Sequence, residues 1–329
     1  MISKSSDYRK LMTAIGVILN LCVLGYFKYF NFFMDIIGID LMNAIINDNH
    51  KIKTVISVAL PLGISFYIFQ GISYLIDVYR GEVKATADFI NFACYITLFP
   101  QLVAGPIVRY SQIEQELTVR KISAERFSKG AARFIMGLAK KLLIADTLGR
   151  VADAAFAVPH GELSAIGAWL GIISYSLQIY FDFSAYSDMA IGIGNMLGFT
   201  FPENFNYPYI SKSAKEFWRR WHISLSSWFR DYVYIPLGGN RAGRAREYFN
   251  QIIVFALCGL WHGASVMFLL WGLYHGFFLT MEKLFPKILD KIPVFFRHIY
   301  AIFRFMFGWV LFRANDMDQA LNYYKSLFG

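Results

Sequence analysis

The stretch QIIVFALCGLWHGASVMFLLWGLYHGFFLTM, residues 251–281, decides the class of this protein. It contains no Lys, Arg, Asp or Glu, and it exceeds the roughly 20 apolar residues that cross the hydrocarbon of a bilayer. Other stretches qualify by the same criterion, at roughly residues 11–34, 54–78, 89–108, 164–198 and 294–312. The sequence therefore predicts an all-α, polytopic membrane protein.

The composition agrees with this prediction. Of the 329 residues, 56% are hydrophobic and only 17% are charged, which is far from the balance of a water-exposed domain. The net charge of +9 comes from short connections between apolar runs, so a membrane explains it better than nucleic-acid binding does. Cations crowd residues 212–246, whereas the connection with Asp153 and Glu162 has almost none. The positive-inside bias makes the first connection cytoplasmic and the second external.

Two of the apolar runs predict irregular backbone. The run at 164–199 is much longer than one span, and the run that ends at Val108 contains Pro100, Gly105 and Pro106. We therefore expect broken, tilted or re-entrant helices there. Such backbone is stable in a bilayer only where it is buried in protein or lines a wet cavity, so we also expect a cavity within the membrane.

Two other segments need separate interpretations. Residues 127–144 carry Arg133, Lys140 and Lys141 among apolar residues, which fits either a span with snorkelling ends or a helix in the interface. The N-terminal apolar run is too long for a cleavable signal peptide and lacks a small-residue cleavage site, so we expect it to be retained as a span.

His262 is the first candidate for chemistry. It lies in Cys258-Gly-Leu-Trp-His-Gly-Ala, and an ionisable group within a membrane segment is a functional candidate by default. A histidine that only bonds one helix to another explains the residue type equally well. Cys258 lies four residues earlier, on the same helical face, a spacing that permits a Cys-His pair and an acyl-enzyme. A thiol in apolar surroundings ionises poorly, so packing is the favoured interpretation, and a Cys258→Ala variant with full turnover would eliminate the covalent route.

The cysteines predict no cross-link or metal site. Cys22, Cys94 and Cys258 each lie alone in an apolar run, without the spacing of a disulfide framework or a zinc site. The nucleotide-hydrolysing P-loop, the HExxH metalloprotease motif and the GxSxG hydrolase motif are also missing from the sequence. These enzyme classes therefore gain no support.

The segment around His222, Phe217-Trp-Arg-Arg-Trp-His-Ile-Ser-Leu-Ser-Ser-Trp-Phe-Arg-Asp, interleaves cationic and aromatic residues. This pattern predicts an amphipathic helix at the membrane surface. Arg219, Arg220 and Arg230 would attract an anionic substrate part, such as the phosphates of a nucleotide-bearing thioester. His275 follows His262 by thirteen positions, which in an unbroken helix turns it to roughly the opposite face, so we interpret it as structural. The remaining histidines, at positions 50, 160 and 298, have no setting that demands a role.

Two polar features remain. Asp182 and Asp188 lie in an apolar run beside the hydroxyls of Ser184 and Tyr186, and a carboxylate there must find donors, so we expect a supporting role. The turn Pro236-Leu-Gly-Gly-Asn-Arg has glycines that would let backbone N–H groups approach a phosphate, although the motif is weak.

Four motifs together resemble the membrane-bound O-acyltransferase family: Phe217-Trp-Arg-Arg-Trp-His222, Trp228-Phe-Arg-Asp-Tyr, Pro236-Leu-Gly-Gly-Asn-Arg and Cys258-Gly-Leu-Trp-His262-Gly-Ala. The chain is most similar to the bacterial branch that O-acetylates exported polysaccharides such as alginate. Further motifs support this branch: Leu60-Pro-Leu-Gly-Ile-Ser-Phe, Asp77-Val-Tyr-Arg-Gly, Phe99-Pro-Gln-Leu-Val-Ala-Gly-Pro-Ile and Gly308-Trp-Val-Leu-Phe-Arg-Ala. Family members usually have further spans beyond both ends of this match, so residues 1–329 are expected to form a single core without those terminal spans.

The resemblance implies a site and a setting. His262 matches the family's catalytic histidine, and His222 matches the second motif position. Supporting or substrate-binding roles are expected for Trp261, Asp182, Ser184, Tyr186, Arg219, Arg220, Arg230, Asp231 and Asn240, with no metal and no bound cofactor. The family fold is a helical funnel through the cytoplasmic (inner) membrane, with re-entrant or interfacial helices. It implies acetyl-CoA or another thioester as co-substrate on one side, and an extracytoplasmic polysaccharide or a periplasmic acetyltransferase partner on the other.

A mechanism follows as a hypothesis. His262 would take the proton of an attacking hydroxyl, since neutral imidazole has a suitable pKa. His222, or nearby indole and backbone N–H groups, would stabilise the oxyanion, an effect of about 3 kcal/mol per donor in other acyl transfers. Two alternatives stay open. One is D-alanyl transfer to teichoic acid from a carrier protein, and the other, more remote, is a polysaccharide or proton-coupled transporter that uses Asp182 and Asp188.

Overall fold

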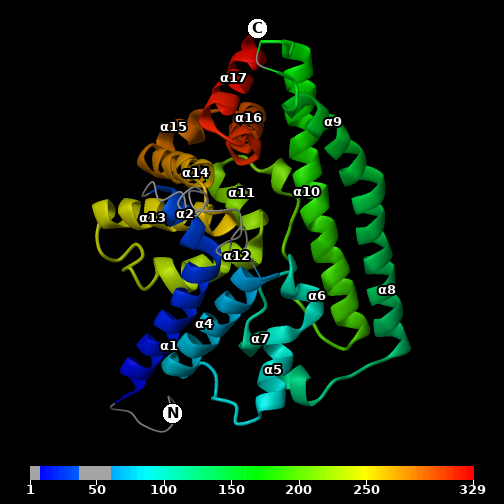
Figure 1. The fold of residues 1–329 in the computed structure, drawn as a ribbon, viewed down its shortest axis with the longest axis vertical. Helices are drawn as coiled ribbons and strands as arrows, with labels where there is room; N and C mark the ends of the chain where they lie inside the picture. The colour runs from blue at the N-terminus through cyan, green and yellow to red at the C-terminus, as the bar shows by residue number, and fades with distance from the viewer. Residues whose placement is uncertain (1–7, 37–60, 160) are drawn as a thin grey trace, which may run out of the picture.

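The computed structural model describes residues 8–36, 61–159 and 161–329, and this part of the chain contains helices but no strand (Figure 1). The predictions for His50, His160 and residues 54–60 lie outside the described residues. The helices are α1 (Arg9–Leu24), η1 (Gly25–Tyr29), α2 (Phe30–Ile36), α4 (Ile64–Arg80), α5 (Phe89–Thr97), α6 (Phe99–Leu102), α7 (Tyr110–Thr118), α8 (Ala124–Ala139), η2 (Lys140–Ala145), α9 (Asp146–Phe156), α10 (Ala165–Met196), η3 (Pro208–Ile210), α11 (Ala214–Arg220), α12 (Ile223–Phe229), η4 (Arg230–Tyr234), α13 (Arg244–His262), α14 (Val266–Leu284), α15 (Pro286–Lys291), α16 (Val294–Arg313) and α17 (Met317–Phe328).

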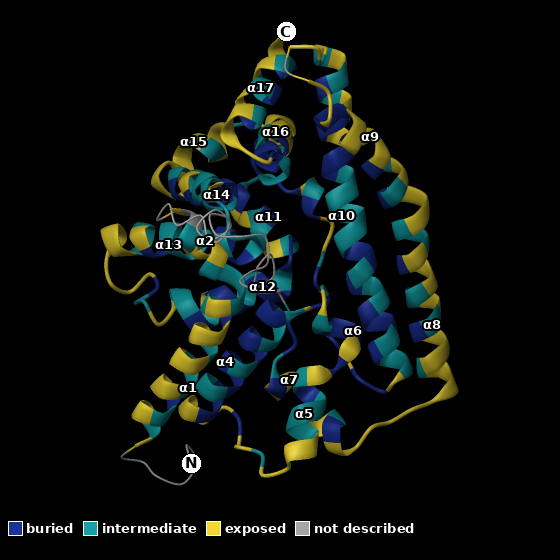
Figure 2. Ribbon diagram, viewed as in Figure 1, coloured by how far each residue is buried: buried dark blue, intermediate teal, exposed yellow. Residues whose placement is uncertain are grey.

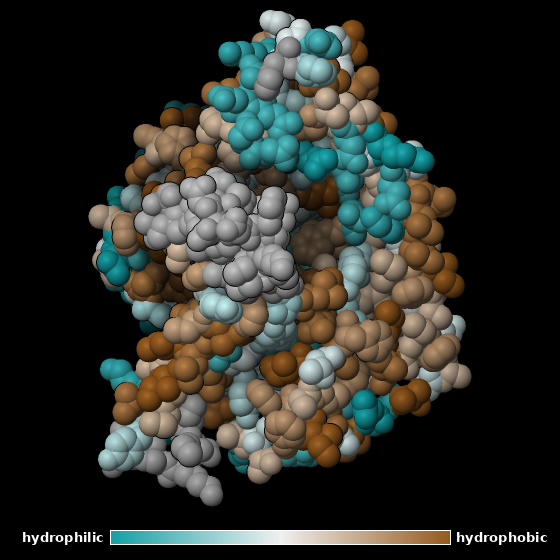
Figure 3. All heavy atoms as spheres, viewed as in Figure 1, coloured by the Kyte–Doolittle hydropathy of each residue, from teal (hydrophilic) through white to brown (hydrophobic). Residues whose placement is uncertain are grey.

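Within the described ranges, two helices are long and apolar enough to cross a membrane, Arg9–Met34 and Val294–Arg313. They confirm the helices predicted at 11–34 and 294–312. The first continues through η1, a π-helical segment, without ending. Large apolar side chains also lie exposed on other helices, such as Leu143 of η2 at 73% and Ile166 of α10 at 75%, and the surface is brown over wide areas in Figure 3. An exposed apolar surface of this kind is typical of a protein that faces lipid.

A tilted helix at 164–199 stays a prediction, whereas a broken or re-entrant one is wrong, because α10 runs unbroken for 32 residues. At 1.5 Å per residue it is about 48 Å long, which exceeds the hydrocarbon thickness. The helices α8, η2 and α9 lie along it (Figure 1). They approach closely through glycine: a Cβ added to Gly130 would lie 2.6 Å from the carbonyl oxygen of Gly192.

The cations at 127–144 point toward α10, and the two interpretations of this segment, a span or an interfacial helix, stay predictions. Arg133 and Lys140 pair with Asp188 at 2.9 and 2.6 Å, and Lys141 pairs with Asp182 at 2.8 Å. These ion pairs supply the donors that the two carboxylates were expected to require.

The apolar run at 251–281 is two helices rather than one span. The first, α13, ends at His262, and α14 begins at Val266. Gly263 is extended between them (φ −165°, ψ 148°), and the side chain of Ser265 caps α14 by accepting a hydrogen bond from the N–H of Met267. His262 and His275 therefore lie on different helices, and the prediction that they occupy opposite faces of one helix is wrong. His275 is fully buried in α14, with Nδ1 3.2 Å from a guanidinium nitrogen of Arg304.

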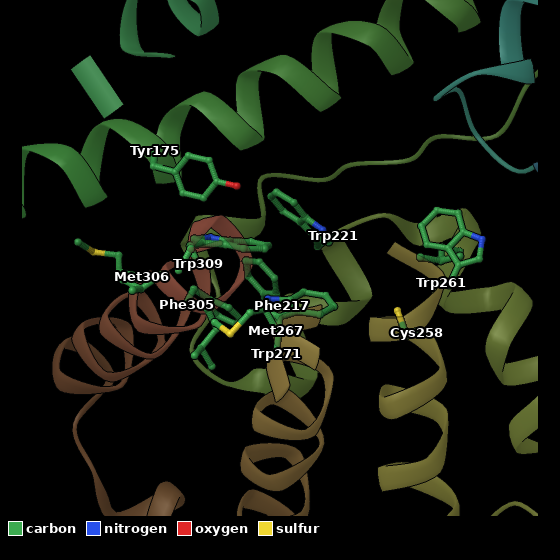
Figure 4. Close-up of a cluster of buried hydrophobic side chains, with 14 of the residues drawn as sticks. Tyr175, Phe217, Trp221, Cys258, Trp261, Met267, Trp271, Phe305, Met306 and Trp309 are labelled. Atoms are coloured by element: carbon green, nitrogen blue, oxygen red, sulfur yellow. The ribbon is translucent and has the colours of Figure 1, made fainter. Parts of the chain in front are cut away.

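The break predicted before Val108 is confirmed. After α5, the helix α6 is a single turn, and the chain then runs without regular structure to Arg109. Gly105 and Pro106 are buried in this stretch. Figure 2 shows buried positions along α4 and α10. Figure 4 shows a cluster of buried aromatic side chains from α11, α14 and α16, among them Phe217, Trp271 and Trp309.

Candidate active site

His262 is the last residue of α13. Its ring stands nearly perpendicular to three aromatic rings, those of Trp261, Trp271 and Phe312, with centroids 4.8 to 5.1 Å away. The imidazole is thus surrounded by aromatic side chains at the C-terminal end of α13, directly before Gly263.

The helix end that carries His262 is held by two residues of η1. The last carbonyls of a helix have no partner within it. Here the phenol of Tyr29 donates to the carbonyl of Leu260 at 2.8 Å, and the ammonium of Lys28 donates to the carbonyl of Trp261. Lys28 also donates to the hydroxyl of Ser65 at 3.0 Å. Two consecutive residues of η1 therefore cap α13.

One side of His262 faces a cavity of about 270 Å³, here called the aromatic cavity. Its lining is Ala104, Ile179, Asp182, Phe183, Tyr186, Trp221, His262, Trp271, Trp309 and Phe312. Of the predicted supporting residues, it brings Asp182 and Tyr186 together with His262. Because Asp182 pairs with Lys141 of η2, its carboxylate is held beside the cavity by that segment.

The other side faces a larger cavity of about 420 Å³, here called the cationic cavity. Its cationic lining residues are Lys215, Arg219, Arg230 and Lys283, and it also includes His222, Cys258 and His262. Glu247 pairs with Lys283 at 2.5 Å, and Asp231 pairs with Arg230 at 2.6 Å. Four cations thus face two carboxylates, so the cavity favours the binding of an anion, as expected for the arginines of this segment.

Two residues, His262 and Trp221, line both cavities. They therefore form a common wall between a cationic space and an aromatic space. Trp221 is 3% exposed, and its indole lies near the rings of Phe217 and Trp309 (Figure 4). The ring of Phe205 also packs against it, with centroids 5.2 Å apart. This packing fixes the wall.

His222 is buried rather than displayed on a surface helix. The predicted amphipathic helix is broken: α11 ends at Arg220 and α12 begins at Ile223. Between them His222 adopts left-handed backbone (φ 44°, ψ 55°) and is 1% exposed. A residue other than glycine is uncommon in this conformation and is worth examining as a functional position. Its Nδ1 lies 3.2 Å from the side-chain oxygen of Asn204.

Some predicted residues lie elsewhere. Arg220 bonds Glu216 and the carbonyl of Asn206 instead of joining the cationic lining. The hydroxyl of Ser184 is directed to its own helix, to the carbonyl of Phe181. The side chain of Trp261 stacks on Phe69.

The turn at 236–241 does not present the backbone N–H groups that were predicted to approach a phosphate. The N–H groups of Gly238 and Gly239 donate to the carbonyls of Ile235 and Tyr234 at 3.0 and 2.9 Å, so the turn itself uses them. Asn240 is exposed beside them.

Asp231 anchors η4 through two guanidinium groups. Arg230 and Arg109 donate to it at 2.6 and 2.8 Å. Burial alone would raise the pKa of Asp231, but these hydrogen bonds outweigh burial and hold the pKa below its ordinary value.

Sequence reasoning missed Asn204, Trp221 and Lys28. Lys28 offered a signal, since it is a cation inside an apolar run. Trp221 belonged to a quoted motif but not to the predicted site. Asn204 lies in an ordinary polar connection, and nothing local marks it as the partner of His222.

The sequence model of the membrane-bound O-acyltransferase family matches residues 2–317. The chain belongs to this family. Its two histidine motifs, at His222 and His262, meet at the cationic cavity.

Individual relatives refine the family assignment. A probable alginate O-acetylase of Azotobacter vinelandii is 48% identical over 318 residues, which are 95% of this chain and 62% of that protein. A peptidoglycan O-acetyltransferase of Helicobacter pylori is 37% identical over 358 residues, covering 99% of this chain and 66% of that protein. A teichoic acid D-alanyltransferase of Bacillus subtilis is 32% identical over 239 residues, covering 69% of this chain and 60% of that protein. The chain thus spans about three fifths of the length of the first of these relatives.

Proposed function

We propose that this chain is the single core of a membrane O-acyltransferase that takes an acetyl group from acetyl-CoA, or a similar thioester, to O-acetylate an exported polysaccharide. The observation that carries the proposal is the common wall, because His262 and Trp221 line both cavities. One imidazole is therefore within reach of a substrate on either side. Acetyl is favoured over D-alanyl because the relatives named as O-acetylating enzymes are 48% and 37% identical, against 32% for the D-alanyltransferase.

The charges orient the two substrates. Phosphates of the donor bind in the cationic cavity, where Arg219 and Arg230 supply guanidinium groups. The positive-inside bias puts this cavity on the cytoplasmic side of a multi-pass protein in the cytoplasmic membrane. The aromatic cavity then receives the acceptor hydroxyl from the outside, from the polysaccharide or from a periplasmic transferase partner. The two cavities together would form the funnel of the fold.

The chemistry is one acyl transfer. Neutral His262 takes the proton of the acceptor hydroxyl as its oxygen attacks the thioester carbonyl. The new C–O ester bond forms, the C–S bond breaks, and the leaving thiolate takes up the proton from the imidazolium. The thiol leaves from the cationic cavity and the ester from the aromatic cavity, so only the acetyl group and the proton carried by His262 cross the wall.

An indole is our candidate oxyanion donor. Trp271 lines the aromatic cavity with His262, and its Nε1 is buried with no acceptor among the described residues. An unpaired buried N–H costs free energy unless a substrate satisfies it. A preorganised donor of this kind lowers the barrier most when charge develops on the carbonyl oxygen.

The test compares His262→Ala with His298→Ala, a variant of a histidine that lines neither cavity. Acetyl ester is measured on the exported polymer, and acetyl transfer from acetyl-CoA is measured in membrane vesicles, with matched protein levels. We expect His262→Ala to lose about 10²-fold to 10⁴-fold, the usual contribution of a general base, and His298→Ala to match the wild type. Unchanged transfer in His262→Ala would overturn the proposal. If the vesicles transfer D-alanyl from a carrier protein and no acetyl from acetyl-CoA, the protein is a D-alanyltransferase and the acetyl donor proposed here is wrong.

A further inference from the structure

Asn204 is buried at 1% exposure in the connection that follows α10. Its side-chain oxygen faces three donors. These are the Nδ1 of His222 at 3.2 Å, the backbone N–H of Ser224 at 3.2 Å and the hydroxyl of Ser224 at 2.9 Å. The Asn204 amide is therefore the centre of a buried polar cluster in contact with the second motif histidine.

The orientation of this amide is fixed by its other partners. A backbone N–H only donates, so the atom beside the N–H of Ser224 is the oxygen. The Asn204 nitrogen donates to the hydroxyl of Ser187 at 3.1 Å. The hydroxyl of Ser224 accepts from the N–H of Ile107 at 2.9 Å, which directs its own hydrogen to the Asn204 oxygen. Each hydrogen bond in the cluster thus has one direction.

This direction determines the tautomer of His222. A carbonyl oxygen has no hydrogen to give, so the contact at Nδ1 is favourable only when Nδ1 carries the hydrogen. Neutral imidazole then has a lone pair at Nε2, and that atom is buried with no partner among the described residues. The ring lies against Phe183 and Trp261, with centroids 4.6 and 5.9 Å away, an apolar setting that favours the neutral form.

Asn204 also supports the backbone of His222. The carbonyl of Asn204 accepts the N–H of Ile223 at 2.9 Å, directly after the left-handed residue. Left-handed backbone costs about 1–3 kcal/mol at a residue other than glycine and persists where its surroundings hold it. One residue therefore holds both the ring and the main chain of His222.

We propose that Asn204 is a positioning residue that holds neutral His222 with its hydrogen on Nδ1, so that Nε2 accepts a hydrogen bond from an amide N–H of the thioester donor. The proposal rests on the function proposed above. His222 lines the cationic cavity but not the aromatic cavity, so its partner belongs to the donor. Phosphates and the thioester carbonyl offer no hydrogen at neutral pH, whereas the amides of an acyl-CoA arm do. His222 then orients the donor, and the oxyanion is left to an N–H such as that of Trp271.

The tautomer is measured directly by ¹⁵N NMR of histidine-labelled protein in lipid bilayers, without substrate. His222→Gln identifies the signal by its loss. We expect Nδ1 with hydrogen and Nε2 without it in the wild type, and a mixture of tautomers in Asn204→Ala. Asn20→Ala is the matched control, because within the described part of the chain the Asn20 amide donates only to the carbonyl of Gly16 in its own helix. Hydrogen on Nε2 in the wild type, or an unchanged tautomer in Asn204→Ala, would overturn the proposal.

Kinetics with acetyl-CoA in membrane vesicles supply the second measurement. Loss of one hydrogen bond predicts that His222→Leu and Asn204→Ala raise KM about fivefold to tenfold, with a smaller change in kcat. His222→Gln keeps an acceptor atom near the position of Nε2 and should stay within about twofold of the wild type. An equal loss of kcat in His222→Gln and His222→Leu would instead show proton transfer by His222 and contradict the assigned role. The NMR experiment does not depend on turnover. The tautomer of His222 can therefore be confirmed even if His262→Ala keeps its activity, and the acyltransferase proposal can be confirmed even if the predicted tautomer is wrong.

Discussion

The phenol of Tyr29 donates a hydrogen bond of 2.8 Å to the carbonyl of Leu260, two residues before His262. A helix that can cross the membrane is thereby joined to the helix end that presents the imidazole. Lys28, which precedes Tyr29 in the π-helical segment η1, donates to the carbonyl of Trp261, so two neighbouring residues of η1 contact the end of α13.

Tyr29→Phe removes this donor and leaves the Leu260 carbonyl without its partner. We expect a loss of about 1 kcal/mol of stability, seen as a fall of about 2 °C in Tm, together with reduced acetyl transfer as the helix end loosens. Tyr26→Phe is the control, since Tyr26 lies exposed in the same segment. Equal behaviour of the two variants would show that the contact does not hold the helix end.

Gly259 lies where α13 crosses α14. A Cβ added there would meet the backbone carbonyl of Phe268 and would lie 3.2 Å from the Cα of Gly272. Gly259→Ala should therefore push the helices apart, at a cost of about 1–3 kcal/mol. It should also lower acetyl transfer about 10²-fold by displacing His262 by roughly 1 Å. Gly25→Ala is the control, because nothing lies within 4 Å of its added Cβ. Normal transfer in Gly259→Ala would contradict the close crossing.

Arg219 lines the cationic cavity and Arg244 does not. Arg219→Gln should raise KM for acetyl-CoA about tenfold, the loss of one charge-assisted hydrogen bond, and should weaken the dependence of KM on salt. Arg244→Gln removes the same charge from an exposed site and should change neither quantity. The comparison is made from initial rates at two salt concentrations. Parallel changes in both variants would mean that net charge alone acts.

The ion pairs of Asp231 predict a pH dependence of stability. A carboxyl with a lowered pKa stabilises the fold above its ordinary pKa, and this contribution is lost as the pH falls through the lowered value. At pH 7 we expect Asp231→Asn to be less stable than the wild type by about 1 kcal/mol. This difference should shrink as the pH falls below about 4, the ordinary value of Asp. Thermal unfolding across that range tests it, and a difference that grows at low pH would refute the sign.

Cys258 lines the cationic cavity one turn before His262. Since its thiol is buried in apolar surroundings, we expect Cys258→Ala to keep normal turnover and to form no acyl-enzyme. Rapid-quench labelling with radioactive acetyl-CoA detects a covalent acyl group. Loss of turnover at normal protein levels, with labelling of the wild type alone, would restore the covalent route.

Hydropathy predicted the helices at 11–34 and 294–312, but it could not place breaks inside apolar sequence. Gly263 and Ala264 are apolar enough to hide the end of α13, although Ser265 before an apolar run is a recognisable cap. For α10 the error was the opposite one: a break was predicted from the length of the apolar run alone, and the helix is continuous.

The site was predictable to the extent that its motifs are local. His262 was marked by an apolar setting, and Arg219 by its aromatic neighbours. The partners of these residues come from distant segments. Asn204 meets His222 across an 18-residue separation, and Lys28 meets the carbonyl of Trp261 from 233 residues away. No periodicity or composition reports such contacts, because they arise only from the packing of complete helices.

A wall made of His262 and Trp221 also gives small-molecule blockers two routes to one imidazole. A compound in the aromatic cavity would displace the acceptor and leave the thioester bound, whereas one in the cationic cavity would do the reverse. Blockers of the two kinds would bind together instead of competing. In the orientation proposed above, those of the first kind would reach their cavity from the extracytoplasmic side, without crossing the cytoplasmic membrane.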